Sequence, residues 1–90
     1  MDGTVIEEKI RTYIVNELMR DHAQPELKRE ESLLDQGIID SLGLFKLIAF
    51  IEEEFRIAME PQEVRTDNFE TLAMVTEMVR RKIAEKSARS

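Results

Sequence analysis

The sequence predicts an all-α fold, a four-helix bundle of three longer helices and one short helix, with a long loop between the first two helices. Apolar residues recur at spacings of three and four over most of the chain, as they do along one face of a helix. Only 3 Gly and 2 Pro interrupt the 90 residues, and with 0 Cys no disulfide framework can hold a loop-rich fold together. A chain of this length is expected to form one domain over residues 1–90.

The first long helix is expected from Thr4 to about Arg20. Thr4 and Glu7 have the spacing of a capping box, in which a hydroxyl and a carboxylate satisfy backbone N–H groups at a helix start. The apolar stripe of this helix consists of Ile6, Ile10, Tyr13, Ile14 and Leu18.

Residues 21–40 are expected to form a long, ordered loop. Pro25 disfavours a helix there, and Gly37 permits a tight turn. Loops of this length in small domains are usually functional or packed on themselves. The residues available for packing are Leu27, Leu33, Leu34, Ile38 and Ile39.

The second helix is expected over residues 41–55, with apolar residues on more than one face. The wide stripe, which should face the core, consists of Leu44, Leu47, Ile48, Ile51 and Phe55. A narrower stripe consists of Leu42, Phe45 and Ala49. Either this stripe is a second packed face, or it is an exposed surface kept for a partner.

A loop with Pro61, a short capped helical turn at Thr66–Phe69 and a last helix capped by Thr71 complete the predicted fold. The helical body should cover about residues 4–84, followed by a basic tail at about 85–90. The buried face of the last helix consists of Leu72, Val75, Val79 and Ile83. The predicted core consists of Ile10, Ile14, Leu47, Ile51, Phe55, Leu72 and Val79.

The net charge of -6 argues against nucleic acid as a partner and favours basic protein surfaces. Arg80, Arg81, Lys82 and Lys86 are concentrated near the end of the last helix, where the helix dipole favours cations. No secretory leader and no membrane-spanning stretch is recognisable, so a monomeric cytoplasmic protein is expected.

Ser41, at the junction of the long loop and the second helix, is the main candidate for chemistry. Serine is a common N-cap, so an ordinary capping role is the plain interpretation. A hydroxyl at a helix N-terminus also lies where a phosphate is favoured. A nucleophilic serine would need a base, and the only histidine, His22, is expected to be solvated, so neither an enzyme nor a metal site is predicted.

The sequence around Ser41 resembles the acyl carrier and peptidyl carrier proteins. The resemblance rests on the run Leu33-Leu34-Asp35-Gln36-Gly37-Ile38-Ile39-Asp40-Ser41-Leu42, followed by Leu47 and by Ile51-Glu52-Glu53-Glu54-Phe55. It extends over essentially the whole chain, from the first helix to the last.

This resemblance implies that Ser41 is esterified by 4′-phosphopantetheine, whose thiol carries acyl or aminoacyl groups as thioesters. Asp40 and Leu42 flank the attachment site. Asp40 matches the family's acidic residue beside the serine, which helps the phosphopantetheinyl transferase and its metal to engage the hydroxyl.

The resemblance also implies a partner surface on the second helix. Leu42 and Phe45 match positions that contact partner enzymes, and Ala49 lies on the same stripe. Glu52 and Glu53 match acidic positions farther along the helix. The implied partners are the transferase, an acyl- or aminoacyl-activating ligase, and synthase or transferase enzymes of the pathway.

Gly43 and Lys46 stand where the carriers of fatty acid synthesis usually have acidic residues. Enzymes that read those acids with basic patches should bind less well. The chain therefore looks more like a free-standing carrier of a specialised pathway, of fatty acid, polyketide or nonribosomal peptide type. The alternative is an acidic helical interaction module without a prosthetic group, which explains Leu42 and Phe45 but not the Asp-Ser pair.

Overall fold

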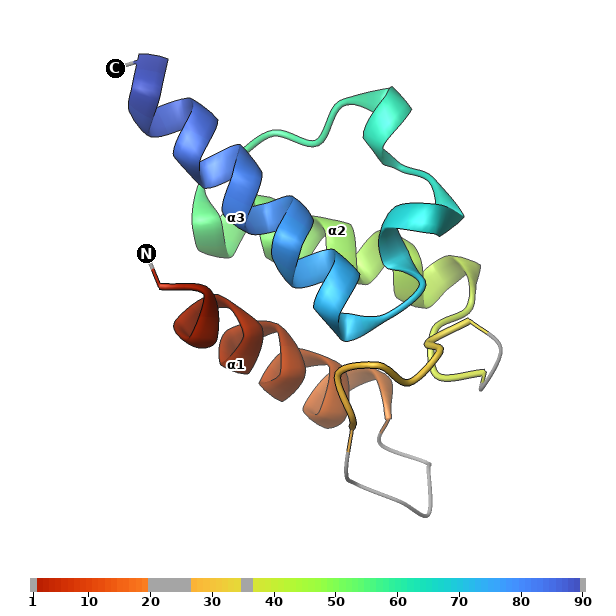
Figure 1. The fold of residues 1–90 in the computed structure, drawn as a ribbon. Helices are drawn as coiled ribbons and strands as arrows, with labels where there is room; N and C mark the ends of the chain where they lie inside the picture. The colour runs from red at the N-terminus through yellow and green to blue at the C-terminus, as the bar shows by residue number, and fades with distance from the viewer. Residues whose placement is uncertain (1, 20–26, 35–36, 90) are drawn as a thin grey trace.

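A computed structural model describes residues 2–19, 27–34 and 37–89, apart from the side chains of residues 66 and 89. Its helices are α1 (Gly3–Tyr13), the π-helical η1 (Ile14–Leu18), α2 (Ser41–Phe55), the 3₁₀ turns η2 (Pro61–Glu63) and η3 (Thr66–Phe69), and α3 (Leu72–Arg89) (Figure 1).

The all-α prediction is confirmed, and β pairing within the described residues consists of one isolated bridge between Ser32 and Thr71. The predicted short helix is present as the 3₁₀ turn η3, not as a fourth α-helix. His22, Pro25, Asp35 and Gln36 lie outside the described residues.

The predicted start of the first helix is wrong. Asp2, not Thr4, is the N-cap of α1, and its carboxylate accepts the Thr4 N–H at 3.2 Å. The helix therefore begins at Gly3, and Glu7 pairs with Arg11 and Arg29 instead of closing a capping box. The end of the helix, η1, is π-helical, with the Met19 N–H donating to the Ile14 carbonyl at 2.9 Å.

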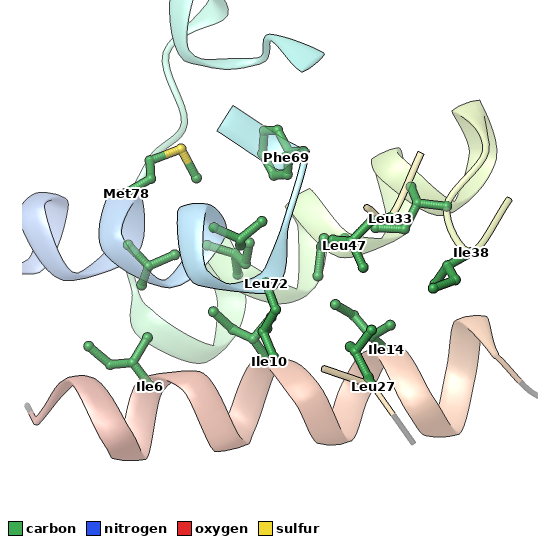
Figure 2. Close-up of a cluster of buried hydrophobic side chains, with 14 of the residues drawn as sticks. Ile6, Ile10, Ile14, Leu27, Leu33, Ile38, Leu47, Phe69, Leu72 and Met78 are labelled. Carbon is green, nitrogen blue, oxygen red and sulfur yellow. The ribbon is translucent and has the colours of Figure 1, made fainter. Parts of the chain in front are cut away.

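The core lies between α1, α2 and α3, and the seven predicted core residues are all buried. Ile6 and Ile10 of α1 and Ile14, the first residue of η1, project toward the other helices (Figure 2). From α2, Leu47 and Ile51 are fully buried and Phe55 is 7% exposed. The spacing of three and four residues therefore identified the faces that pack together.

The described part of the long loop packs against the start of α3. The Leu33 N–H donates to the Glu70 carbonyl at 2.8 Å, and the Ala73 N–H donates to the Arg29 carbonyl at 2.9 Å. Gly37 adopts a φ of 70°, as the predicted turn requires. Leu27, Leu33, Ile38 and Ile39 are buried, and Leu34 is partly buried. These contacts fix the approach of the chain to the start of α2.

The last helix is longer than predicted. Thr71 caps it as expected, since its hydroxyl accepts the Met74 N–H at 3.1 Å. The helix continues to Arg89, so residues 85–89 are helical and do not form a tail. Lys86 near its end donates to the carbonyl of Arg56, which ends α2 in a left-handed conformation. Within the described residues, no helix is long and apolar enough to span a membrane.

Candidate functional site

Ser41 is the first residue of α2, and it is exposed. The N-cap of this helix is Asp40, whose Oδ1 accepts the Gly43 N–H at 2.7 Å. The interpretation of Ser41 as an ordinary N-cap is therefore wrong, because its neighbour makes that bond. The Ser41 hydroxyl is left at the surface beside a helix start that is already capped.

The start of α2 fits a phosphodiester on the Ser41 hydroxyl. The N–H of Leu44 donates to the Asp40 carbonyl at 2.8 Å, which is the first backbone bond of the helix. The N–H groups of Ser41 and Leu42 precede it, and N–H groups at this place, together with the helix dipole, favour an anion. A depression of about 200 Å³ beside Asp40 and Leu42 is also lined by Lys46, whose ammonium group adds a positive charge.

The narrow apolar stripe of α2 is an exposed strip. Phe45 is 67% exposed and Leu42 is 62% exposed, the two largest values among the exposed large hydrophobic residues that the structure describes. Ala49 is exposed on the same face. The reading as a second packed face is therefore wrong, and the exposed surface is what the structure contains.

The acidic residues predicted beside this strip differ in their surroundings. Glu53 is exposed. Glu52 is partly buried, and its Oε2 accepts the Met59 N–H at 2.9 Å, so it also orders the chain after α2. Their neighbour Glu54, which was not predicted as part of this surface, makes an ion pair of 3.0 Å with Lys9 of α1. Glu53 is thus the member of this group that is most available to a partner.

A contact that the sequence did not reveal ties the middle of α2 to α1. The Tyr13 hydroxyl donates to the Lys46 carbonyl at 3.2 Å, and its ring stacks on Phe50 with centroids 4.3 Å apart. Tyr13 was on the predicted stripe of the first helix, but Phe50 was on neither predicted stripe of the second, so the apolar pattern did not indicate this contact. The contact holds the middle of α2 in place relative to α1.

Neither a metal site nor a catalytic triad is assembled near Ser41 in the part of the chain that the structure describes. No three His, Cys, Asp or Glu side chains gather there as metal ligands would. The site consists instead of one exposed hydroxyl, a capped helix start and an apolar strip. Such a site can present a covalently attached group, and no histidine among the described residues lies beside the hydroxyl as a base.

Known proteins are similar to this chain in sequence. The family described as phosphopantetheine attachment site matches residues 8–79. The D-alanyl carrier protein of Abiotrophia defectiva is 32% identical over 70 residues, which cover 74% of this chain and 89% of that protein. The probable acyl carrier protein PigG of Serratia sp. (strain ATCC 39006) is 26% identical over 77 residues, which cover 86% of this chain and 87% of that protein.

The matched region begins within α1, includes all of α2 and ends within α3, so it contains the site and most of the buried core. Carrier proteins are not themselves enzymes, as the sequence predicted for this chain. The chain therefore belongs to the family of phosphopantetheine-binding carrier proteins, whose prosthetic group is 4′-phosphopantetheine attached covalently to a serine.

Proposed function

We propose that Ser41 carries the 4′-phosphopantetheine and that the chain delivers acyl or aminoacyl groups to the enzymes of a specialised biosynthetic pathway. When bound, the group supplies a thiol that holds the cargo as a thioester. The observation that carries the proposal is the exposed Ser41 hydroxyl at the first position of α2, beside the Asp40 cap and the exposed Leu42 and Phe45.

The other serines have less suitable surroundings. Ser32 is partly buried and bridges to Thr71. Ser87 lies in the last turns of α3. The helix dipole disfavours a phosphate at this C-terminal end. Ser90 lies outside the described residues. Ser41 thus combines exposure with a helix N-terminus.

Acyl and aminoacyl cargo both have support from the relatives. One of them is named a D-alanyl carrier protein, and D-alanine is an aminoacyl group. The other is named a probable acyl carrier protein. The partners proposed for this chain are a phosphopantetheinyl transferase, an activating ligase and the pathway's synthase or transferase enzymes. The monomeric state and the cytoplasmic location remain predictions from the sequence.

Intact mass spectrometry tests the attachment directly. The chain is incubated with coenzyme A and a broad-specificity phosphopantetheinyl transferase, and the mass should rise by one phosphopantetheine. Ser41→Ala should abolish the gain, while the matched control Ser87→Ala should keep it.

The fold of Ser41→Ala should be preserved, because Asp40 makes the capping bond and Ser41 does not. Its free energy of unfolding should change by no more than about 0.5 kcal/mol, as for other exposed substitutions. If Ser41→Ala still gains the group, or the wild type gains none with several active transferases, an interaction module without a prosthetic group is the better explanation.

A further inference from the structure

Asp40, the residue before Ser41, accepts two hydrogen bonds from residues of α2 that follow Ser41. Its backbone carbonyl accepts the Leu44 N–H at 2.8 Å, and its Oδ1 accepts the Gly43 N–H at 2.7 Å. Asp40 itself is extended, with φ of -103° and ψ of -171°. The two bonds join the residue before Ser41 to the second and third residues after it, so they fix the backbone from which the hydroxyl projects.

Gly43 leaves room for this close approach. It is buried, and a Cβ atom on it would lie 3.2 Å from Oδ1 of Asp40 and 3.7 Å from Cδ2 of Leu18. Glycine is an unfavourable residue within a helix, because it loses more backbone entropy than alanine on folding. The contact with the Asp40 carboxylate gives a reason for a glycine at this place.

From this geometry we propose that Asp40 is a positioning residue for Ser41, acting through the Gly43 N–H, and that loading by the transferase depends on this cap. The inference rests on the proposed function, since it concerns how the Ser41 hydroxyl is presented to the transferase. It differs from the role that the family resemblance implied for Asp40, which is an encounter with the transferase and its metal.

Three substitutions of Asp40 separate the cap from the charge. Asp40→Asn keeps a short acceptor, since asparagine caps helices as well as aspartate does, and removes the charge. Asp40→Glu keeps the charge but is not among the preferred capping residues. Asp40→Ala removes both. If the cap is what matters, loading of Asp40→Asn should stay within about twofold of the wild type, while Asp40→Glu and Asp40→Ala should lose roughly fivefold or more in kcat/KM.

Amide exchange provides a readout that does not depend on loading. In the unmodified wild type and Asp40→Asn, the Gly43 amide should exchange with similar protection from solvent, since both side chains accept its hydrogen. In Asp40→Glu and Asp40→Ala, the same amide should exchange roughly fivefold faster or more. Circular dichroism should show a folded helical chain in all four proteins.

Gly43→Ala tests the same contact from the other side. The added methyl group should push the Asp40 carboxylate away and lower kcat/KM for loading in the wild-type background. In the Asp40→Ala background no carboxylate remains to be displaced, so Gly43→Ala should cause no further loss. An equal loss in both backgrounds would mean that the two residues do not act through each other.

The inference is overturned if Asp40→Glu loads like the wild type while Asp40→Asn loads poorly, because charge would then be the requirement. That result leaves the proposed function intact, since the wild type would still be loaded at Ser41. Failure of the proposed function is recognised separately, by a wild type that gains no mass or by Ser41→Ala that still does.

Discussion

Replacing Phe45 with alanine should weaken recognition by partner enzymes much more than it weakens the fold. Phe45 is 67% exposed, so about one third of it is already buried in the isolated chain. Full burial of a phenylalanine is worth about 1.5–3 kcal/mol, so the substitution should cost about 0.5–1 kcal/mol of unfolding free energy. A partner that covers the remaining two thirds gains about 1–2 kcal/mol, which corresponds to roughly 5- to 30-fold in affinity.

The assay measures loading by a phosphopantetheinyl transferase as the concentration of the carrier is varied. Phe45→Ala should raise KM for the carrier by that factor, with thermal unfolding recorded on the same sample. Val5→Ala is the matched control, because Val5 is 43% exposed but lies on α1, away from the strip of Leu42, Phe45 and Ala49.

Two results would refute this reasoning. An unchanged KM in a folded Phe45→Ala protein would mean that the transferase does not cover the strip. A loss of 3 kcal/mol or more in unfolding free energy, which is about the cost of emptying a buried aromatic site, would mean that Phe45 packs in the core.

Lys46→Glu should change the free energy of unfolding by no more than about 0.5 kcal/mol, because Lys46 is exposed. It should raise kcat/KM with a fatty-acid-pathway enzyme that has a basic docking patch, and an unchanged rate would mean that Lys46 is not part of the partner surface. Phe69→Ala should cost about 3–5 kcal/mol in urea unfolding, since Phe69, the last residue of η3, is fully buried (Figure 2), and a loss below about 1 kcal/mol would contradict that burial. Burial raises the pKa of Glu63, but the Lys82 hydrogen bond at 2.7 Å, the Glu60 N–H and nearby cations outweigh it and hold the pKa below its ordinary value of 4.5. The resulting stabilisation is fully present above pH 4.5 and is lost as the pH falls through the lower pKa of the folded state. The difference in unfolding free energy between the wild type and Glu63→Gln should therefore shrink on acidification, and a constant difference would contradict the pairing.

The helices and their buried faces could be predicted because packing imposes a period on the sequence. On α2, Leu47, Ile51 and Phe55 fall at spacings of four and are buried, as the stripe indicated. The narrower stripe of Leu42, Phe45 and Ala49 was ambiguous in the sequence, since a second packed face and an exposed strip have the same period. Only the position of the neighbouring helices decides between them, and it leaves Leu42 and Phe45 exposed.

The predicted caps of the first two long helices, Thr4 and Ser41, were wrong for the same reason. Asp2 stands close before Thr4, and Asp40 directly before Ser41, and all of these residue types are good N-caps. The cap is the residue whose backbone is still extended where the helix begins, and that point depends on tertiary contacts of the preceding chain. For α2, the contact is the approach of Ile39 and Leu18 to the buried Gly43, which no local pattern reports.

The end of α3 and the helix type of η3 follow from helix propensity and segment length, which the periodicity of apolar residues does not report. Residues 85–89 contain neither Gly nor Pro, and lysine and alanine favour a helix, so α3 continues through a segment that charge alone marked as a tail. Thr66–Phe69 is only four residues long, too short for a stable series of α-helical hydrogen bonds, and it forms a 3₁₀ turn.

The position of Ser41 depends on contacts far from it in the sequence, because the chain that leads into α2 is held by the start of α3. The bonds from Leu33 to Glu70 and from Ala73 to Arg29 anchor that chain, and the Ile39 N–H returns to the Leu33 carbonyl at 3.0 Å. Asp40 follows directly and caps the helix. The core therefore holds α2 and the Ser41 hydroxyl from one side of the helix, while the exposed strip lies on the other side. Substitutions in the strip can therefore change recognition without moving the proposed attachment site.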